Sequence, residues 1–239
     1  MATKTDFIIA GCTVADSDEL TNNNIPAFWA DPHWRLAWRH RTLEYHISQV
    51  AKRTPRNLIS DSETKRQQKA VDAATGRIVG FARWYLPSSH SKNTDGTPVW
   101  SEAMVPAVSA EEEAEIQRVA QTTHWDPNEE SDELLIPICK AKNEILGKQS
   151  YLRLDYLAVH PDNQGKGVGS ALVQSGMKQA EGLGLDIFIH AMKAGVGLYQ
   201  RLGFHVEKEF VQYDTKYGGE GDVYTALMVN RHKGGHDGF

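Results

Sequence analysis

A glycine-rich stretch at residues 164–170, Gln-Gly-Lys-Gly-Val-Gly-Ser, is the feature of this sequence that most directly suggests chemistry. The apolar run at 154–159 before it is predicted to be a buried strand, which Pro161 ends, and a helix is expected from Ser170 onwards. Glycines at such a turn let backbone N–H groups approach a ligand, and a helix N-terminus carries partial positive charge. The turn is therefore expected to hold a phosphate or diphosphate.

Three anion-binding patterns compete for this stretch. The dinucleotide pattern needs a third glycine where Ser170 stands, and the P-loop needs a Gly-Lys-Ser/Thr tripeptide that is absent. The pattern that fits is Gln-x-x-Gly-x-Gly after a Leu-Ala-Val strand and a His-Pro-Asp turn, and it resembles the acetyl-CoA motif of the GNAT superfamily of N-acyltransferases. A lone glycine-rich loop is often an ordinary connection. Residues 195–204, however, resemble a second GNAT signature, the Leu-Tyr-x-x-x-Gly-Phe helix.

The resemblance implies a fold of the α/β (α+β) class in which one GNAT domain spans residues 1–239. Its central sheet is mixed and mostly antiparallel, is flanked by helices, and splits between the fourth and fifth strands to admit acetyl-CoA. Residues 86–150 form an unusually long connection between the third and fourth strands. Helices are predicted in it at 109–121 and 137–146, and we interpret it as a partly helical lid over the acceptor site. The other strands are expected at 7–14, 64–71, 77–85, 186–190, 206–213 and 223–229.

The resemblance also implies which residues hold coenzyme A. The backbone of Leu157, Ala158 and Val159 is expected to bind the pantetheine arm, and an N–H near Leu157 to polarise the thioester carbonyl. Tyr199 aligns with the tyrosine that protonates the leaving thiolate in many family members. Met192 stands where the family often has an asparagine that contacts the cofactor. The diphosphate would be held by Gln164, Gly165, Lys166, Gly167, Val168, Gly169 and Ser170.

The base that deprotonates the acceptor amine has two candidates. Alternation along the strand places Asp155 on the side of Leu157 and Val159, where a buried aspartate with a raised pKa would suit a base. Alternatively, Asp155 pairs with a neighbouring arginine. His190, at the end of the next strand, is the reserve candidate.

The segment from His33 to Val50 is predicted to be one helix with an aliphatic side and an aromatic side. Trp34 and Trp38 belong to the aromatic side, which is either core or a wall of the acceptor pocket together with His190. A helix is also expected from residues 16–20, kinked or restarted at Pro26. Residues 52–56 are expected to form a linker.

The composition and net charge of this 239-residue chain limit its partners. A net charge of −5 argues against a general nucleic-acid binder, and two cysteines suit a reducing compartment without a disulfide framework. No apolar run is long enough to cross a membrane, and no signal peptide is recognisable. The expected address is the cytoplasm, with the nucleus left open. The histidines of the tail 231–239 are not expected to bind a metal.

The sequence thus predicts an enzyme that transfers the acetyl group of acetyl-CoA directly to a primary amine of a small molecule, in a ternary complex. Two alternatives stay open: acetylation of a protein lysine or N-terminus, and a module that binds acetyl-CoA without turnover. A monomer or a homodimer is expected.

Overall fold

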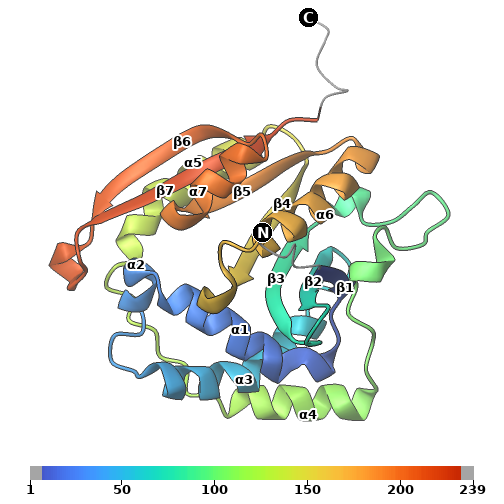
Figure 1. The fold of residues 1–239 in the computed structure, drawn as a ribbon, viewed down its shortest axis with the longest axis horizontal. Helices are drawn as coiled ribbons and strands as arrows, with labels where there is room; N and C mark the ends of the chain where they lie inside the picture. The colour runs from blue at the N-terminus through green and yellow to red at the C-terminus, as the bar shows by residue number, and fades with distance from the viewer. Residues whose placement is uncertain (1–6, 233–239) are drawn as a thin grey trace, which may run out of the picture.

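The computed structural model describes residues 7–232, which are built around a seven-stranded sheet of order β1-β2-β3-β4-β5-β7-β6 (Figure 1). Neighbouring strands are antiparallel except β4 and β5, which are parallel. The predicted mixed, mostly antiparallel sheet is confirmed. The strands are β1 (Phe7–Gly11), β2 (Lys65–Asp72), β3 (Ile78–Tyr85), β4 (Tyr151–Val159), β5 (Asp186–Met192), β6 (His205–Tyr213) and β7 (Asp222–Asn230).

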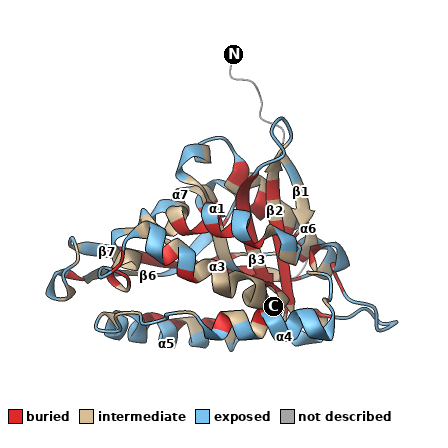
Figure 2. Cartoon of the chain, turned by 90° about the horizontal axis from the view of Figure 1, so that it is seen from below, coloured by how far each residue is buried: buried red, intermediate tan, exposed pale blue. Residues whose placement is uncertain are grey.

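Helices cover both faces of the sheet. Leu20 of α1, Leu58 of α3 and Phe81 of β3 share a buried cluster on one face. Leu172 of α6 and Tyr199 of α7 belong to the main core on the opposite face. Figure 2 shows α4 and α5 as a layer on one side of the sheet and α7 on the other. The helices are α1 (Ser17–Trp29), α2 (Pro32–Leu36), α3 (Leu43–Ile59), α4 (Ala110–Gln121), α5 (Leu135–Leu146), α6 (Val168–Leu183) and α7 (Lys193–Arg201).

The sheet splits between β4 and β5, as predicted. The two strands pair only from Tyr151 with Asp186 to Leu154 with Ile189. Beyond Leu154 they diverge, while β4 continues to pair with β3 as far as Val159. The edge of β4 that faces the gap therefore leaves its backbone groups available to a ligand.

A β-bulge lies in β4 at the start of the split. Tyr156 is opposite Arg83 of β3 and Leu154 is opposite Trp84, so Asp155 is the extra residue. The bulge interrupts the alternation, and Asp155 and Tyr156 both contact the side chain of Arg83. The predicted placement of Asp155 on the side of Leu157 is therefore wrong, because it assumed an unbroken period of two.

The helix predicted from His33 to Val50 is two helices. The first, α2, ends at Leu36, and α3 begins after Thr42, whose hydroxyl accepts a hydrogen bond from the backbone N–H of Tyr45 at 3.2 Å. The predicted linker at 52–56 lies inside α3, and α1 likewise runs through Pro26 without ending. Packing of α1 against α3 and the sheet overrides the local proline signal.

The long connection 86–150 contains both predicted helices. Ser109 caps α4 by accepting from the backbone N–H of Glu112 at 3.1 Å, and α5 begins two residues before the expected position. The helix α4 packs on α3, and α5 packs through Ile138 and Ile145 on Phe188 of β5. The two helices thus form an outer layer on α3 and β5, and the role of the insertion as a lid stays a prediction.

Candidate active site

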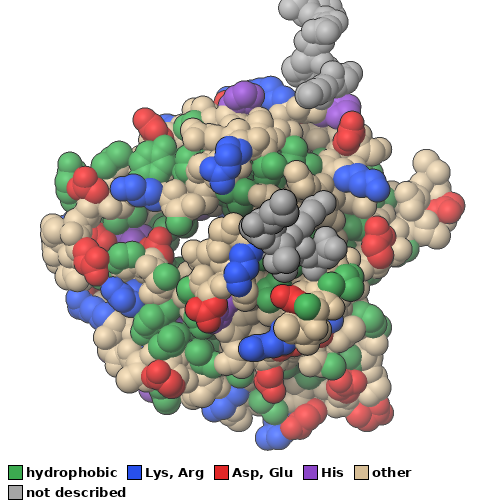
Figure 3. Space-filling view, in the orientation of Figure 1, with side chains coloured by type: hydrophobic (Ala, Val, Ile, Leu, Met, Phe, Trp, Pro, Cys, Tyr) green, Lys and Arg blue, Asp and Glu red, His purple; other side chains and the backbone are tan. Residues whose placement is uncertain are grey.

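A cleft of about 490 Å³ opens where β4 and β5 diverge. Its walls come from the end of α1, the end of β4, the turn at 163–170, β5 and α7. In the space-filling view an opening passes through the molecule between α7 and the end of β4 (Figure 3). The volume is typical of small-molecule sites.

The glycine turn has the conformation that an anion site requires. Gly165 and Gly167 have φ angles of +75° and +92°, in the left-handed region that favours glycine. A Cβ on either residue would meet no atom within 4 Å, so both border open space. Because α6 begins at Val168, its unpaired N–H groups lie at the same place. Both features fit a diphosphate group.

Two polar side chains shape this turn. Gln164 Nε2 donates to the carbonyl oxygen of Val159 at 3.2 Å and ties the turn back to β4. Lys166 Nζ donates to Asn163 Oδ1 at 2.9 Å. Asn163 and Gln164 line the cleft, whereas Lys166 is not part of its lining. The predicted part of Lys166 in holding a diphosphate stays a prediction.

The end of β4 presents Leu157 and Val159 to the cleft. Ala158, between them, is 2% exposed and lies opposite Phe81 of β3, so its side chain is not part of the lining. Only its backbone can contribute to a binding edge. This agrees with a pantetheine site made of main-chain groups, which stays a prediction.

Tyr199 lies in the wall opposite β4, on α7. Its side chain is 6% exposed and packs on Phe204, with ring centroids 5.7 Å apart. Burial raises the pKa of the Tyr199 phenol, which therefore keeps its proton at neutral pH. A Cβ on Gly195 would lie 2.8 Å from Tyr199 Cε2, so the glycine makes room for the ring. Met192 also lines the cleft.

Asp155 is in the cleft wall but is not the buried aspartate that the sequence suggested. Its side chain is 35% exposed, and its Oδ2 accepts from Arg83 Nε at 2.8 Å and lies 2.5 Å from Nη2. The ion pair with Arg83, one of the two alternatives, is what the structure contains. The bulge turns the carboxylate to this partner.

The aromatic side chains that line the cleft are not the ones predicted. Phe28 and Tyr156 line the cleft with ring centroids 4.5 Å apart. Trp34 packs behind Phe28 at 5.7 Å, and Trp38 is buried against His46 at 4.3 Å. Neither tryptophan is part of the cleft lining, and both belong to an aromatic cluster around His46.

His190 does line the cleft, as predicted, and the lining residues that the sequence did not indicate include Tyr156, Asp31, Phe28 and Arg201. Asp31 caps α2 by accepting from the backbone N–H of Trp34 at 2.9 Å. Its Asp-Pro sequence is a helix-start signal that could have placed it. Phe28 follows the expected break at Pro26, and Arg201 lies within the second signature, but neither carries a distinctive signal.

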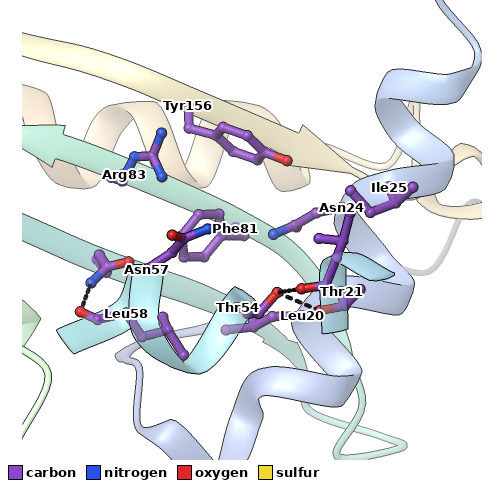
Figure 4. Close-up of a pocket in the computed structure, with 12 residues that line it drawn as sticks. Leu20, Thr21, Asn24, Ile25, Thr54, Asn57, Leu58, Phe81, Arg83 and Tyr156 are labelled. Atoms are coloured by element: carbon purple, nitrogen blue, oxygen red, sulfur yellow. Dashed lines mark hydrogen bonds between the residues drawn. The ribbon is translucent and has the colours of Figure 1, made fainter. Parts of the chain in front are cut away.

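A second cavity lies behind Tyr156, between α1, α3 and strands β3 and β4 (Figure 4). The hydroxyls of Thr21 and Thr54 meet in it at 2.7 Å, and Asn24 lies beside them. Its volume of about 80 Å³ is far below that of a substrate site. Tyr156 forms the wall between this cavity and the cleft.

Within 7–232 no group of three or more His, Cys, Asp or Glu side chains is arranged to hold a metal ion. No helix in the same range has the length and apolar character to cross a membrane. Of the two tail histidines, His236 lies outside the described residues.

Comparisons with known families match the part of the chain that carries β4, the glycine turn, β5 and α7. Residues 132–206 match the model of the acetyltransferase (GNAT) domain. An L-methionine sulfoximine/L-methionine sulfone acetyltransferase of Pseudomonas aeruginosa is 34% identical over 64 residues, which are 25% of this chain and 37% of that protein. A mycothiol acetyltransferase of Streptomyces coelicolor is 39% identical over 64 residues, which are 25% of this chain and 21% of that protein. The chain thus spans about a third or less of these relatives.

Solved structures extend the similarity to the whole fold. One described as histone acetyltransferase HPA2 and related acetyltransferase, from Corynebacterium glutamicum, aligns with a TM-score of 0.56 at 18% identity, covering 95% of this chain and 96% of that one. An agmatine N-acetyltransferase aligns with a TM-score of 0.51 at 16% identity, covering 94% and 100%. At such identities the likeness shows the fold alone.

Proposed function

We propose that this chain, which carries an acetyltransferase domain of the GNAT superfamily, transfers the acetyl group of acetyl-CoA to a primary amine of a small molecule. The observation that carries the proposal is the cleft itself. One wall consists of main-chain groups and a glycine turn suited to coenzyme A, and the other presents side chains to an acceptor. The opening through the molecule supports direct transfer with both ligands bound at once (Figure 3).

The residues present fit coenzyme A, which supplies the thioester that is cleaved. The turn at 164–170 would hold the diphosphate through its N–H groups. The free edge of β4 at Leu157 and Val159 would hold the pantetheine arm as a neighbouring strand would, and an N–H near Leu157 would polarise the carbonyl. Arg201 adds a cation to the lining on the side of α7.

Tyr199 is proposed to donate the proton that the leaving sulfur needs. Its raised pKa keeps the phenol protonated until the C–S bond breaks, as a general acid requires. The group that accepts the proton of the amine lies on the acceptor side, where Asp155 and His190 are the candidates. Asp155 stays paired with Arg83, and that pairing favours an electrostatic role.

The acceptor is proposed to be a small cationic amine. Asp31 and Asp155 are the carboxylates in the cleft wall, and Phe28 and Tyr156 supply aromatic faces that attract cations. A molecule such as agmatine suits this wall better than an amino acid, because the carboxylate of the amino acid would face two aspartates. The cleft volume also suits a small molecule better than a protein segment.

The test is release of free thiol from acetyl-CoA in the presence of a panel of amines that includes agmatine, L-methionine sulfoximine and a lysine-containing peptide. We expect turnover with small cationic amines and weaker turnover with the amino acid. Turnover with the peptide alone would favour a protein acceptor. Binding of acetyl-CoA without any acetylation across the panel would contradict the enzyme and favour a binding module.

A further inference from the structure

We propose that His190 is the general base of this site, the side chain that takes the proton from the acceptor nitrogen, and that Asp155 faces it across the cleft to attract the amine. This inference rests on the proposed function and adds the residue that moves the proton.

The strand register places the two groups at equivalent points. Leu154 and Ile189 are the last pair between β4 and β5. The residues that follow this pair are Asp155 on β4 and His190 on β5. They therefore lie on opposite sides of the gap, at the point where the two strands begin to diverge. Both line the cleft. A reacting atom held at the mouth of the split would therefore lie between them.

The face of the sheet on which His190 lies also fits a residue that acts on the acceptor. Phe188 of β5 packs with α5, whereas Ile189 and Ala191 belong to the core beneath α6 and α7. By alternation His190 faces the side of Phe188. Tyr199 and the glycine turn belong to the α6 and α7 side. The proposed base and acid thus approach the reacting atoms from opposite faces of the sheet, as a transfer between two ligands requires.

The imidazole is not committed to a structural hydrogen bond. Among residues 7–232 neither ring nitrogen of His190 has a hydrogen-bond partner, and Nε2 is buried. Nδ1 is not among the buried unpartnered atoms, so it is the ring nitrogen that a ligand in the cleft can reach and the one that would accept the proton. Asp155, by contrast, already accepts from Arg83.

The charges around His190 favour the form that a base needs. Burial and the ammonium group of Lys142 on α5 lower its pKa below the ordinary value, while Asp155 on β4 opposes them. Asp31, from the turn before α2, is a further carboxylate in the same cleft. The ring is therefore neutral at pH 7 and can accept a proton.

The proton balance closes with the residues already named. A cationic amine first releases its ammonium proton to solvent. As the C–N bond then forms, the neutral amine loses one N–H proton, which His190 accepts. As the C–S bond breaks, its electron pair stays on sulfur, and Tyr199 donates one proton to it. Return of the proton from His190 to Tyr199 through solvent restores the enzyme, so no oxidant, reductant or further reactant is needed.

The experiment compares His190→Gln, Asp155→Asn and the exposed control His205→Gln with the wild type, measuring kcat against pH at saturating agmatine, or at the best amine of the panel. We expect wild-type kcat to rise with pH through one ionisation below pH 6.5 and then level off. His190→Gln should lower kcat about 100-fold or more and remove this acid limb, while acetyl-CoA binding stays unchanged. His205→Gln should match the wild type.

Two further variants separate catalysis from structure. His190→Ala should regain activity when imidazole is added, which a structural role would not allow. The ammonium group of Lys142 lowers the pKa of His190, so its removal in Lys142→Met should raise that pKa and move the acid limb to higher pH. Wild-type kcat and an intact acid limb in His190→Gln, with both lost in Asp155→Asn, would overturn the inference and leave the acetyltransferase standing. Failure of the wild type itself to acetylate would instead refute the proposed function.

Discussion

The two walls of the cleft present different kinds of groups, main-chain groups on one side and side chains on the other. The wall proposed for the cofactor consists of the glycine turn, the free edge of β4 and the first turn of α6, so its binding groups belong to the main chain. The opposite wall consists of side chains, Phe28, Asp31, Asp155 and His190 among them. A main-chain site tolerates changes in most side chains, whereas a side-chain site changes its preference with single substitutions. One half of the cleft is thus suited to a constant ligand and the other to a variable one.

The boundary between the two walls is the bulge in β4. Without the extra residue, Asp155 would share the side of Leu157 and Val159. With it, Asp155 joins Tyr156 on the acceptor side, and the two hydrophobic residues stay on the cofactor side. A single inserted position therefore lets one strand serve both walls.

The largest effect is expected for Tyr199→Phe, which removes the proposed acid from the cofactor wall. The ring would keep its packing against Phe204, so we expect acetyl-CoA to bind as before. Turnover should fall about 100-fold or more because the leaving sulfur has no proton donor. Steady-state kinetics and calorimetric titration measure the two quantities. Unchanged kcat would remove Tyr199 from the mechanism.

The next largest effect is expected for Gly167→Val, which tests the main-chain wall. A side chain at φ +92° is strained by about 1–3 kcal/mol and would fill the space at the turn. We expect acetyl-CoA affinity to fall at least about tenfold. The matched control is Gly96→Val, at φ +83° in an exposed loop, where a Cβ also meets open space. Equal loss of affinity in both variants would show that strain, and not the turn, is responsible.

A smaller effect on turnover is expected for Gly195→Ala. The new Cβ would lie 2.8 Å from Tyr199 Cε2, so the ring must shift while the phenol group remains. We expect kcat to fall about tenfold, less than in Tyr199→Phe. Gly197→Ala on the same helix is the control, because its Cβ would meet only the flexible end of Arg201 at 3.5 Å. Equal kcat in the two variants would argue against precise placement of the tyrosine.

The smallest effect is expected on the free energy of unfolding, which should depend on pH through a histidine behind the acceptor wall. His46, behind the acceptor wall, is fully buried among Trp34 and Trp38, and burial, followed by Arg41 and His40, lowers its pKa to about 4. The unfolded chain binds this proton near pH 6.5, so stability is lost as the pH falls from 6.5 towards 4, by about 3 kcal/mol.

Urea unfolding of the wild type and His46→Phe at several pH values measures this contribution. The wild type should lose more unfolding free energy than the variant between pH 6.5 and pH 4. If the unfolding free energies of the two proteins changed equally with pH, His46 would not be the source of the pH dependence.

The two walls also differ in how far the sequence predicts them. The glycine turn follows from a local pattern, because backbone conformation at a strand-to-helix turn is set by residues next to one another. Tyr199 follows from the resemblance of residues 195–204 to a GNAT signature. The acceptor wall depends on where α2 ends and α3 begins and on the bulge at Asp155, which are decided by packing of α1, α3 and the sheet. Phe28 therefore lines the cleft where Trp34 was predicted to, and the helices of 86–150 pack on α3 and β5.

Amide hydrogen exchange with and without coenzyme A tests the central claim most directly, namely that main-chain groups of β4 and the glycine turn hold the cofactor. The account predicts that the ligand protects the amides of 157–159 and 164–170 and leaves those of α3 and α4 unchanged. Binding that protects neither segment, or no binding at all, would contradict it.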